Sequence, residues 1–134
     1  MRKSLMAGSS TLEWPDHFPP SCPPSEAESQ NHEVYRVVFN DPPQLVDFLS
    51  STVRHPHPWP TQAEQCKACG ISVWLNEMKA TGLLRRFQGG MVAKGNMSPD
   101  VGVSLKTGGR GHITWWILKN SEPNYQDFAV ISVS

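Results

Sequence analysis

The stretch KTGGRGHITWWILK, from Lys106 to Lys119, is the best guide in the sequence to how this chain folds. A glycine-rich turn leads into a run of side chains that favour β-strands. Strand alternation puts neighbouring side chains on opposite faces of a sheet. One face of this run, made of Ile113, Trp115 and Ile117, is apolar and is expected in the core. The other face begins polar and ends apolar, as a cleft wall would, with His112, Thr114, Trp116 and Leu118.

Outward from this stretch, the sequence predicts a single α+β domain over residues 33–134, preceded by an irregular, proline-rich and partly disordered arm over residues 1–32. The domain should hold a largely antiparallel sheet of about six strands, with two helices covering one face. A first helix should begin after Asp41 and reach Val53, and a second should follow Asn76. The other strands are expected at residues 34–39, 70–75, 91–94, 101–106 and 128–133.

Charge and composition exclude several classes of function. Twelve basic and twelve acidic residues balance, so long-range electrostatics does not favour nucleic-acid or anionic-membrane binding. No apolar run is long enough to span a membrane, and the start MRKSLMAGSS lacks the apolar segment of a secretory signal. These features predict a cytoplasmic protein. Three cysteines, an odd number, then favour free thiols or a metal over a disulfide framework.

One strand carries a charge that needs an explanation. In VYRVVF, Arg36 shares a strand face with Val34 and Val38. A cation on a buried face needs a partner or a ligand, unless the strand is at an edge and the arginine reaches water along its aliphatic stem. If a cleft exists, its expected ligand-binding residues are Arg36, Ser72, Thr114 and Trp116, with His112 as the candidate catalytic base. No GxSxG elbow or paired carboxylates accompany His112, so whether the chain is an enzyme stays open.

A possible metal site lies in the proline-rich loop before the second strand. His55-x-His57 is followed by Cys66-x-x-Cys69, and these four side chains could bind a structural zinc ion. The alternative is two reduced thiols at the end of a loop. Separately, the turn before His112 could present backbone N–H groups to an anion, with Lys106 and Arg110 adding charge, or could be a plain hairpin.

Several short motifs resemble those of a set of short bacterial proteins that have no established activity. The resemblance covers most of residues 19–133 and implies a fold and a bacterial or phage source rather than a function. It is carried by Tyr35-Arg36, Pro42-Pro43, Asp47-Phe48-Leu49-Ser50, Gly70-Ile71-Ser72-Val73, Ala80 and His112-Ile113-Thr114-Trp115-Trp116.

A more distant resemblance is to the ADP-ribosyltransferase fold. Arg36 in VYRVV resembles the ligand-contacting residue of that fold's first strand, and GISVWLNEMKA resembles its glycine-led strand and helix. The resemblance implies that the strand motif contacts the nicotinamide half of NAD and that a late acidic residue orients the ribose. No Glu or Gln stands in a late strand here, Gln126 being nearest, so an enzyme of this kind would be inactive or use other residues.

Two functions therefore remain as hypotheses. The first is a small ligand- or nucleotide-binding domain of ADP-ribosyltransferase-like shape, of a toxin type or inactive, with NAD as the ligand. There Arg36 would bind phosphate or carboxamide and Trp116 would stack on a ring. The second is a non-enzymatic protein-interaction module of immunity or antitoxin type, with or without zinc, whose exposed tryptophans meet a protein partner.

Overall fold

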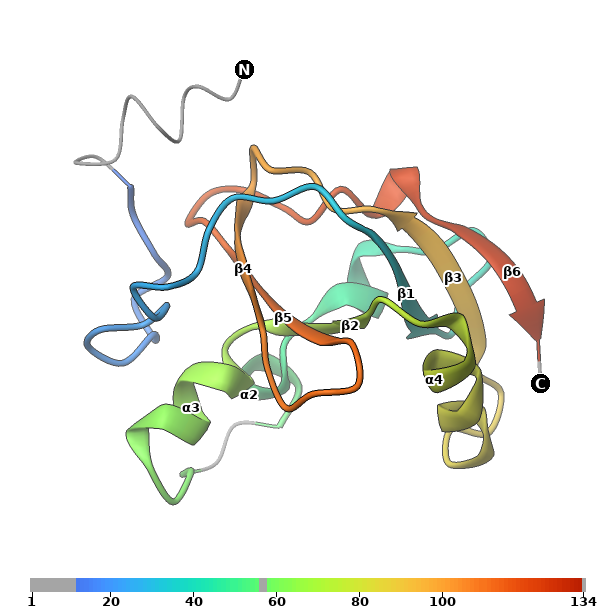
Figure 1. Cartoon of the computed structure of the whole chain (residues 1–134), viewed down its shortest axis with the longest axis horizontal. Coiled ribbons are helices and arrows are strands. Elements are labelled where there is room, and N and C mark those ends of the chain that lie inside the picture. The colour runs from blue at the N-terminus through green and yellow to red at the C-terminus, as the bar shows by residue number, and fades with distance from the viewer. Residues whose placement is uncertain (1–11, 56–57, 134) are drawn as a thin grey trace.

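The computed structural model of the chain describes residues 12–55 and 58–133 and has an α+β fold. The predicted sheet is confirmed, because six strands form one antiparallel sheet in the order β4-β5-β2-β1-β3-β6 (Figure 1). The strand carrying His112 and the two tryptophans is an interior strand with a partner on each side. The strands are β1 Glu33–Val38, β2 Ile71–Trp74, β3 Met91–Asn96, β4 Gly102–Lys106, β5 His112–Ile117 and β6 Ala129–Val133.

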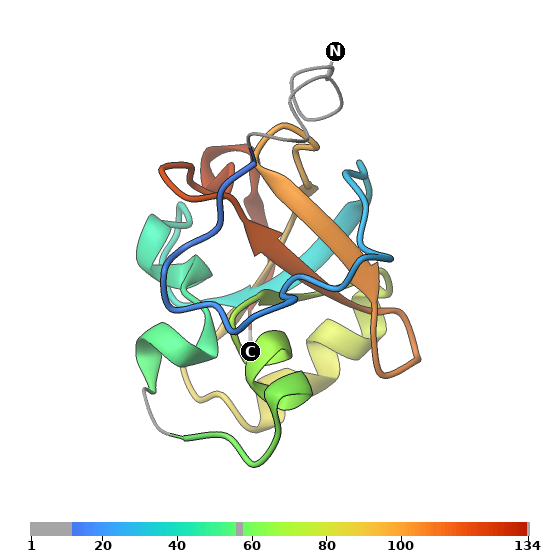
Figure 2. The same cartoon turned by 90° about the vertical axis from the view of Figure 1, so that its left-hand side faces the viewer.

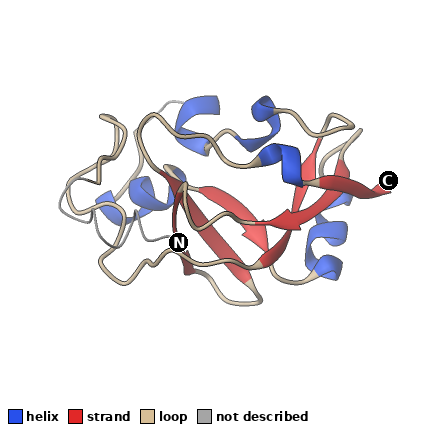
Figure 3. Ribbon diagram, turned by 90° about the horizontal axis from the view of Figure 1, so that it is seen from above, coloured by secondary structure: helices blue, strands red, loops and turns tan. Residues whose placement is uncertain are grey.

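Helices lie on both sides of the sheet rather than on the single face that was expected (Figure 3). The first predicted helix is two short pieces, because Leu49 and Ser50 have extended backbone between them. A helix that was not predicted, α3, replaces the end of the proline-rich loop. The α-helices are α2 Ser51–Arg54, α3 Gln62–Ala68 and α4 Glu77–Gly82, and the 3-10 helices are η2 Leu45–Phe48, η3 Leu83–Arg85 and η4 Tyr125–Asp127.

The main core packs on the face predicted to be apolar. The Phe48 ring from η2 meets Phe128 edge to face, with 5.0 Å between their centroids. Trp115 also stacks with Phe128, with 6.5 Å between the ring centroids. Close packing of large apolar side chains is the main source of stability in a domain of this size. The sheet contributes Val34, Val38, Ile71, Val73, Ala93, Ile113 and Trp115 to this core.

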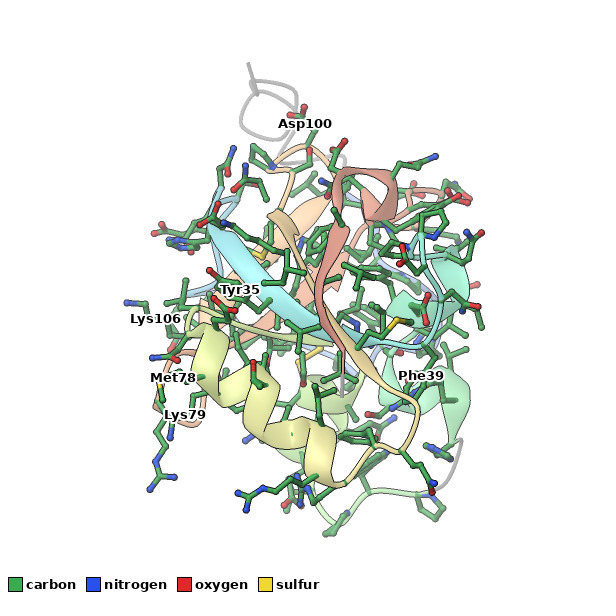
Figure 4. All side chains as sticks on the ribbon, turned by 90° about the vertical axis from the view of Figure 1, so that its right-hand side faces the viewer. Tyr35, Phe39, Met78, Lys79, Asp100 and Lys106 are labelled. Atoms are coloured by element: carbon green, nitrogen blue, oxygen red, sulfur yellow. A yellow bond between two sulfur atoms is a disulfide. The ribbon has the colours of Figure 1, made fainter. Side chains whose placement is uncertain are left out.

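The opposite face is covered at its two ends and open in between. At one end, Ala80 and Leu84 of the α4–η3 segment pack on Val92. Figure 4 shows α4 beside Tyr35 on β1, with Met78 and Lys79 on the side of α4 that faces solvent. At the other end, α3 and the N-terminal arm cover the face. The uncovered middle of the sheet is where a ligand can approach.

The described part of the arm, residues 12–32, is irregular but ordered against the sheet (Figure 2). Glu28 exchanges two backbone hydrogen bonds with Ser104 of the edge strand β4, at 3.0 and 2.8 Å. A disulfide joins Cys22 to Cys66 of α3, with their Cα atoms 5.6 Å apart. The arm therefore covers one edge of the sheet, which would otherwise offer unpaired backbone groups to another chain.

Candidate functional site

The sheet opens between its two central strands. β1 pairs with β3 at six positions, but it pairs with β2 at only one, Tyr35 with Trp74. Beyond that pair the strands separate, and the Arg36 side chain occupies the gap. Its Nη1 donates a hydrogen bond of 2.6 Å to the main-chain carbonyl of Ser72 on β2. The separation of the strands thus brings two predicted site residues, Arg36 and Ser72, together.

Arg36 is charged, half-buried and bonded mainly to neutral groups. Its Nε donates to the Asp47 carbonyl at 2.8 Å, and its guanidinium carbon lies 5.5 Å from the centre of the Phe48 ring. Among residues 12–55 and 58–133, no carboxylate forms an ion pair with it. The pKa of Arg36 is lowered to about 10, mainly by burial and also by the Arg54 charge, while Asp47 opposes the shift. The alternative of an edge-strand arginine is wrong, because β1 lies inside the sheet.

Around Arg36 lies a cleft of about 240 Å³. We call it the cationic cleft, since its lining within the described ranges includes three arginines and no acidic side chain. Trp74 and Phe87 provide aromatic surface in the same wall. Guanidinium groups bind phosphate and carboxylate with paired hydrogen bonds, and aromatic faces stack on rings. The lining residues are Arg36, Val37, Phe39, Arg54, Ser72, Trp74, Leu83, Arg86 and Phe87.

Beside the cleft, His112 is fixed by hydrogen bonds from both of its ring nitrogens. Nε2 lies 3.0 Å from the Ser72 hydroxyl oxygen. Nδ1 lies 3.1 Å from the Thr107 carbonyl and 2.8 Å from the Thr107 hydroxyl. Burial lowers the pKa of His112, a hydrogen bond to the Thr107 backbone opposes that shift, and the Lys67 charge adds to it. The imidazole is therefore mainly neutral near pH 7 and can accept a proton.

A second hollow of about 350 Å³ adjoins the first. Trp74 lines both, and its ring meets the His112 imidazole edge to face at 4.7 Å between centroids. Lys67 from α3 and Arg110 from the β4–β5 turn line the second hollow. The turn residues Gly108, Gly109, Arg110 and Gly111 all have positive φ, which favours glycine at the three glycine positions. Positive charge thus extends on both sides of Trp74.

A wider, mainly apolar hollow of about 430 Å³ lies between the arm, the η2–α2 segment and the loop after β5. Its one lining lysine, Lys119, already pairs with Asp16 at 3.1 Å. The arginines of the cationic cleft have no such pairing within the described residues. Unneutralised charge therefore distinguishes the cationic cleft as the better candidate site.

Two residues predicted to line the cleft do not reach it. Trp116 is fully buried, and its indole N–H donates to the Cys66 carbonyl at 2.8 Å. Thr114 is buried and hydrogen-bonds the Thr107 hydroxyl at 2.7 Å. The physical reason is that the arm and α3 cover their end of the face, which strand alternation alone could not reveal. The structure brings together Arg36, Ser72 and His112, but not Thr114 or Trp116.

Sequence reasoning also missed residues that the cleft contains. Trp74 was not chosen, although a tryptophan two residues from a site serine on the same strand was a usable signal. Arg86 was not chosen either. Arg54 and Lys67 offered no signal, because only the folded chain shows which cations meet in space.

The predicted zinc site is wrong, because the Cys66 sulfur forms a disulfide with Cys22 and cannot act as a thiolate ligand. Burial raises the pKa of the remaining thiol, Cys69, although a hydrogen bond with Thr52 opposes the shift. His55 is exposed, and His57 lies outside the described residues. Within the described ranges, no three side chains of His, Cys, Asp or Glu converge as metal ligands would.

The same disulfide is relevant to the cytoplasmic location that was predicted from the sequence. Structural disulfides persist mainly in oxidising compartments and are rare in the cytosol. The bond therefore gives no support to the cytoplasmic location predicted from the sequence. In the portion of the chain that the structure describes, no helix has both the length and the apolar character needed to cross a membrane.

Comparison of the chain with protein-family models, curated protein sequences and solved structures found no match. The function is therefore inferred from the geometry of the site.

Proposed function

We propose that this chain is a small-ligand-binding domain of ADP-ribosyltransferase-like shape, whose cationic cleft takes an anionic ligand of the nucleotide class, with NAD as the candidate. The observation that carries the proposal is the Arg36 charge. It is partly buried between central strands, and among the described residues no carboxylate lies within ion-pair distance of it, although the charge of Asp47 offsets it in part. A bound phosphate would provide the missing negative charge and accept charge-assisted hydrogen bonds.

The shape and lining of the cleft are consistent with part of a nucleotide. Arg54 and Arg86 add two further donors, while Trp74 and Phe87 offer ring surfaces. A volume of about 240 Å³ is small for a whole dinucleotide. Because Trp74 also lines the second hollow, a longer ligand would pass over this ring toward Lys67 and Arg110. The proposal concerns binding, since the late acidic residue that the resemblance implies is not part of this site.

The test is a titration of the full chain with NAD, followed by tryptophan fluorescence and calorimetry, with adenosine as a ligand that lacks phosphate. We expect binding of NAD and not of adenosine. Arg86→Gln should weaken NAD binding about tenfold or more, because a hydrogen bond to a charged group contributes about 1.5–3 kcal/mol. Arg85→Gln is the matched control, since Arg85 is a neighbouring exposed arginine that does not line the cleft.

Two results would refute the proposal. One is an unchanged signal at millimolar NAD. The other is an equal loss of affinity in Arg85→Gln and Arg86→Gln, which would show that general positive charge, rather than the cleft, attracts the ligand. Trp74→Phe provides a further check, because the fluorescence change should disappear when the tryptophan of the cleft is replaced.

A protein-interaction module is the second candidate, and one observation favours it. Phe39 and Phe87, two of the more exposed large apolar side chains, contact each other edge to face at 6.4 Å beside the cationic cleft. The tryptophans first considered for this role are less suited to it, since Trp115 and Trp116 are buried. Failure of NAD binding, together with loss of a pulled-down protein partner in Phe39→Ser, would favour this candidate.

A cytoplasmic location is also only a proposal, and the Cys22–Cys66 disulfide weighs against it. Rapid alkylation of the chain in its native cells, followed by mass spectrometry, would settle the redox state. One alkylatable thiol after denaturation, that of Cys69, would indicate an oxidising compartment. Three alkylatable thiols would support the cytoplasm.

A further inference from the structure

Ser72 and His112 form a hydroxyl–imidazole pair at the open middle of the sheet. They lie on the neighbouring strands β2 and β5, where Ser72 is paired with Thr114 and Trp74 is paired with His112. The two residues are thus diagonal neighbours on one face. Ser72 is exposed and His112 half-buried, with 3.0 Å between Oγ and Nε2. That distance is within hydrogen-bond reach for a nucleophile and its base.

The protonation of the imidazole follows from its other nitrogen. Nδ1 lies 3.1 Å from the Thr107 carbonyl oxygen, which can only accept a hydrogen bond. Nδ1 therefore carries the hydrogen in the neutral ring, and Nε2 has a free lone pair directed at the Ser72 hydroxyl. The hydroxyl of Thr107, 2.8 Å from Nδ1 and itself bonded to Thr114, further restrains the ring. His112 is thus placed as a base, its Nε2 can accept the serine proton, and Thr107 orients the ring.

Three cations lie near the pair. Lys67 on α3 and Arg110 on the β4–β5 turn line the hollow containing His112, and Arg36 donates to the Ser72 carbonyl. Among the residues that the structure describes, no acidic side chain lines either hollow. The Lys67 charge disfavours the imidazolium form, and positive charge near the pair would stabilise an oxyanion that forms at the serine. An electrophile that carries its own negative charge would also be drawn to this place.

We propose that Ser72 and His112 are the nucleophile and general base of an acyl-transfer site for esters of small anionic acids. Ser72 Oγ forms a bond with the acyl carbon while its proton passes to His112 Nε2. The ester C–O bond then breaks, and the alcohol leaves with the proton from Nε2. Water hydrolyses the acyl-serine, with His112 removing a proton from the water and returning it to Ser72 Oγ. The net reaction is ester plus water giving acid plus alcohol.

This activity goes beyond nucleotide binding and does not depend on it, so its probes contain no nucleotide. Diisopropyl fluorophosphate is incubated with the full, oxidised chain, and intact mass and peptide mapping locate the adduct. Formation of the Oγ–P bond releases fluoride and the serine proton. We expect a single adduct, on Ser72, that Ser72→Ala abolishes and that His112→Gln slows about 100-fold or more. Ser25→Ala and His32→Gln are the controls, because neither residue lines the two hollows or hydrogen-bonds the pair.

A second measurement addresses the anionic substrate class. The p-nitrophenyl monoester of succinic acid should release p-nitrophenol faster than p-nitrophenyl acetate, and Arg110→Gln should reduce that preference. The labelling rate should rise with pH through a midpoint below 6.5, the ordinary pKa of a histidine. A merely structural histidine would not produce this profile.

If Ser72→Ala does not fold, Ser72→Cys provides an independent test, because a thiol near His112 should react with iodoacetamide faster than the thiol of Ser25→Cys. The background is low, since Cys69 is buried and the other two cysteines are bonded together. Absence of a Ser72 adduct, equal labelling of His112→Gln and wild type, or equal reactivity of the two introduced cysteines would each overturn the proposal.

Discussion

His112 is held in the fold as a neutral ring, and this has a consequence for stability. Burial lowers its pKa, and the cations facing it are Lys67 and Arg110, with Arg36 behind Ser72. A base whose pKa is lower in the folded than in the unfolded state takes up more protons when unfolded. Acidification below that unfolded pKa therefore favours the unfolded chain.

We predict that the free energy of unfolding falls as the pH is lowered from about 6.5 toward the lower pKa of folded His112. Urea denaturation at a series of pH values measures the effect. Subtracting the His112→Gln curve should remove the part due to this residue, whereas His32→Gln should leave the wild-type slope unchanged. A His112→Gln curve parallel to that of wild type would contradict the prediction.

For single residues, the sequence identified the chemistry of the side chain better than the surroundings of that side chain. It showed that Arg36 needs a partner, because valines flank it on its strand face. It could not show that the partners are two main-chain carbonyls, one of which depends on the separation of β1 and β2. Trp116 and Thr114 were misplaced for the same reason, since a strand pattern does not reveal what covers a face.

Among the elements, the strands were well predicted and the helices only partly. Alternating apolar residues fixed all six strands to within a few positions. The first helix is broken where Leu49 and Ser50 adopt extended backbone, whereas the Asp47 carboxylate caps the preceding 3-10 turn by accepting from the backbone N–H groups of Phe39 and Gln44. The missed helix α3 had a signal in Thr61-x-x-Glu64, a capping-box pattern, and the Thr61 hydroxyl does accept from the Glu64 N–H at 3.1 Å.

Helix α4 is capped at its N-terminus by the side chain of Asn76. The Asn76 side chain accepts hydrogen bonds from the backbone N–H groups of Met78 and Lys79, at 2.7 and 3.2 Å. Replacing it with alanine should lower the free energy of unfolding by about 1 kcal/mol, the usual contribution of an N-cap. Asn76→Asp keeps an acceptor and should remain close to wild type in urea denaturation. An equal loss in both variants would show that the cap contributes nothing.

At the scale of the whole molecule, the fold class followed from the sequence but the strand order did not. The two central strands, β1 and β2, barely pair, and the site lies where they part. Which strands are neighbours depends on long-range packing, in particular on Phe48 and Phe128 closing the core. Proline content made the arm look like a tail, yet Trp14, Phe18 and Cys22 pack in a cluster with buried Trp116.

The N-terminal arm is joined covalently to α3. The Cys22–Cys66 disulfide closes a loop of 44 residues between the arm and α3, and it thereby restricts the unfolded chain. Cys22→Ser should lower the free energy of unfolding by about 2–4 kcal/mol, as loop-closure entropy predicts for a loop of this size.

The matched control is Cys69→Ser, which leaves the disulfide in place and should keep its redox dependence. Thermal unfolding with and without a reductant measures the difference. Wild type and Cys69→Ser should melt at a lower temperature when reduced, whereas Cys22→Ser should not respond to the reductant. Because Trp116 donates to the Cys66 carbonyl, loss of the disulfide should also loosen the packing around this tryptophan. A Cys22→Ser variant as stable as the oxidised wild type would show that apolar packing alone fixes the arm.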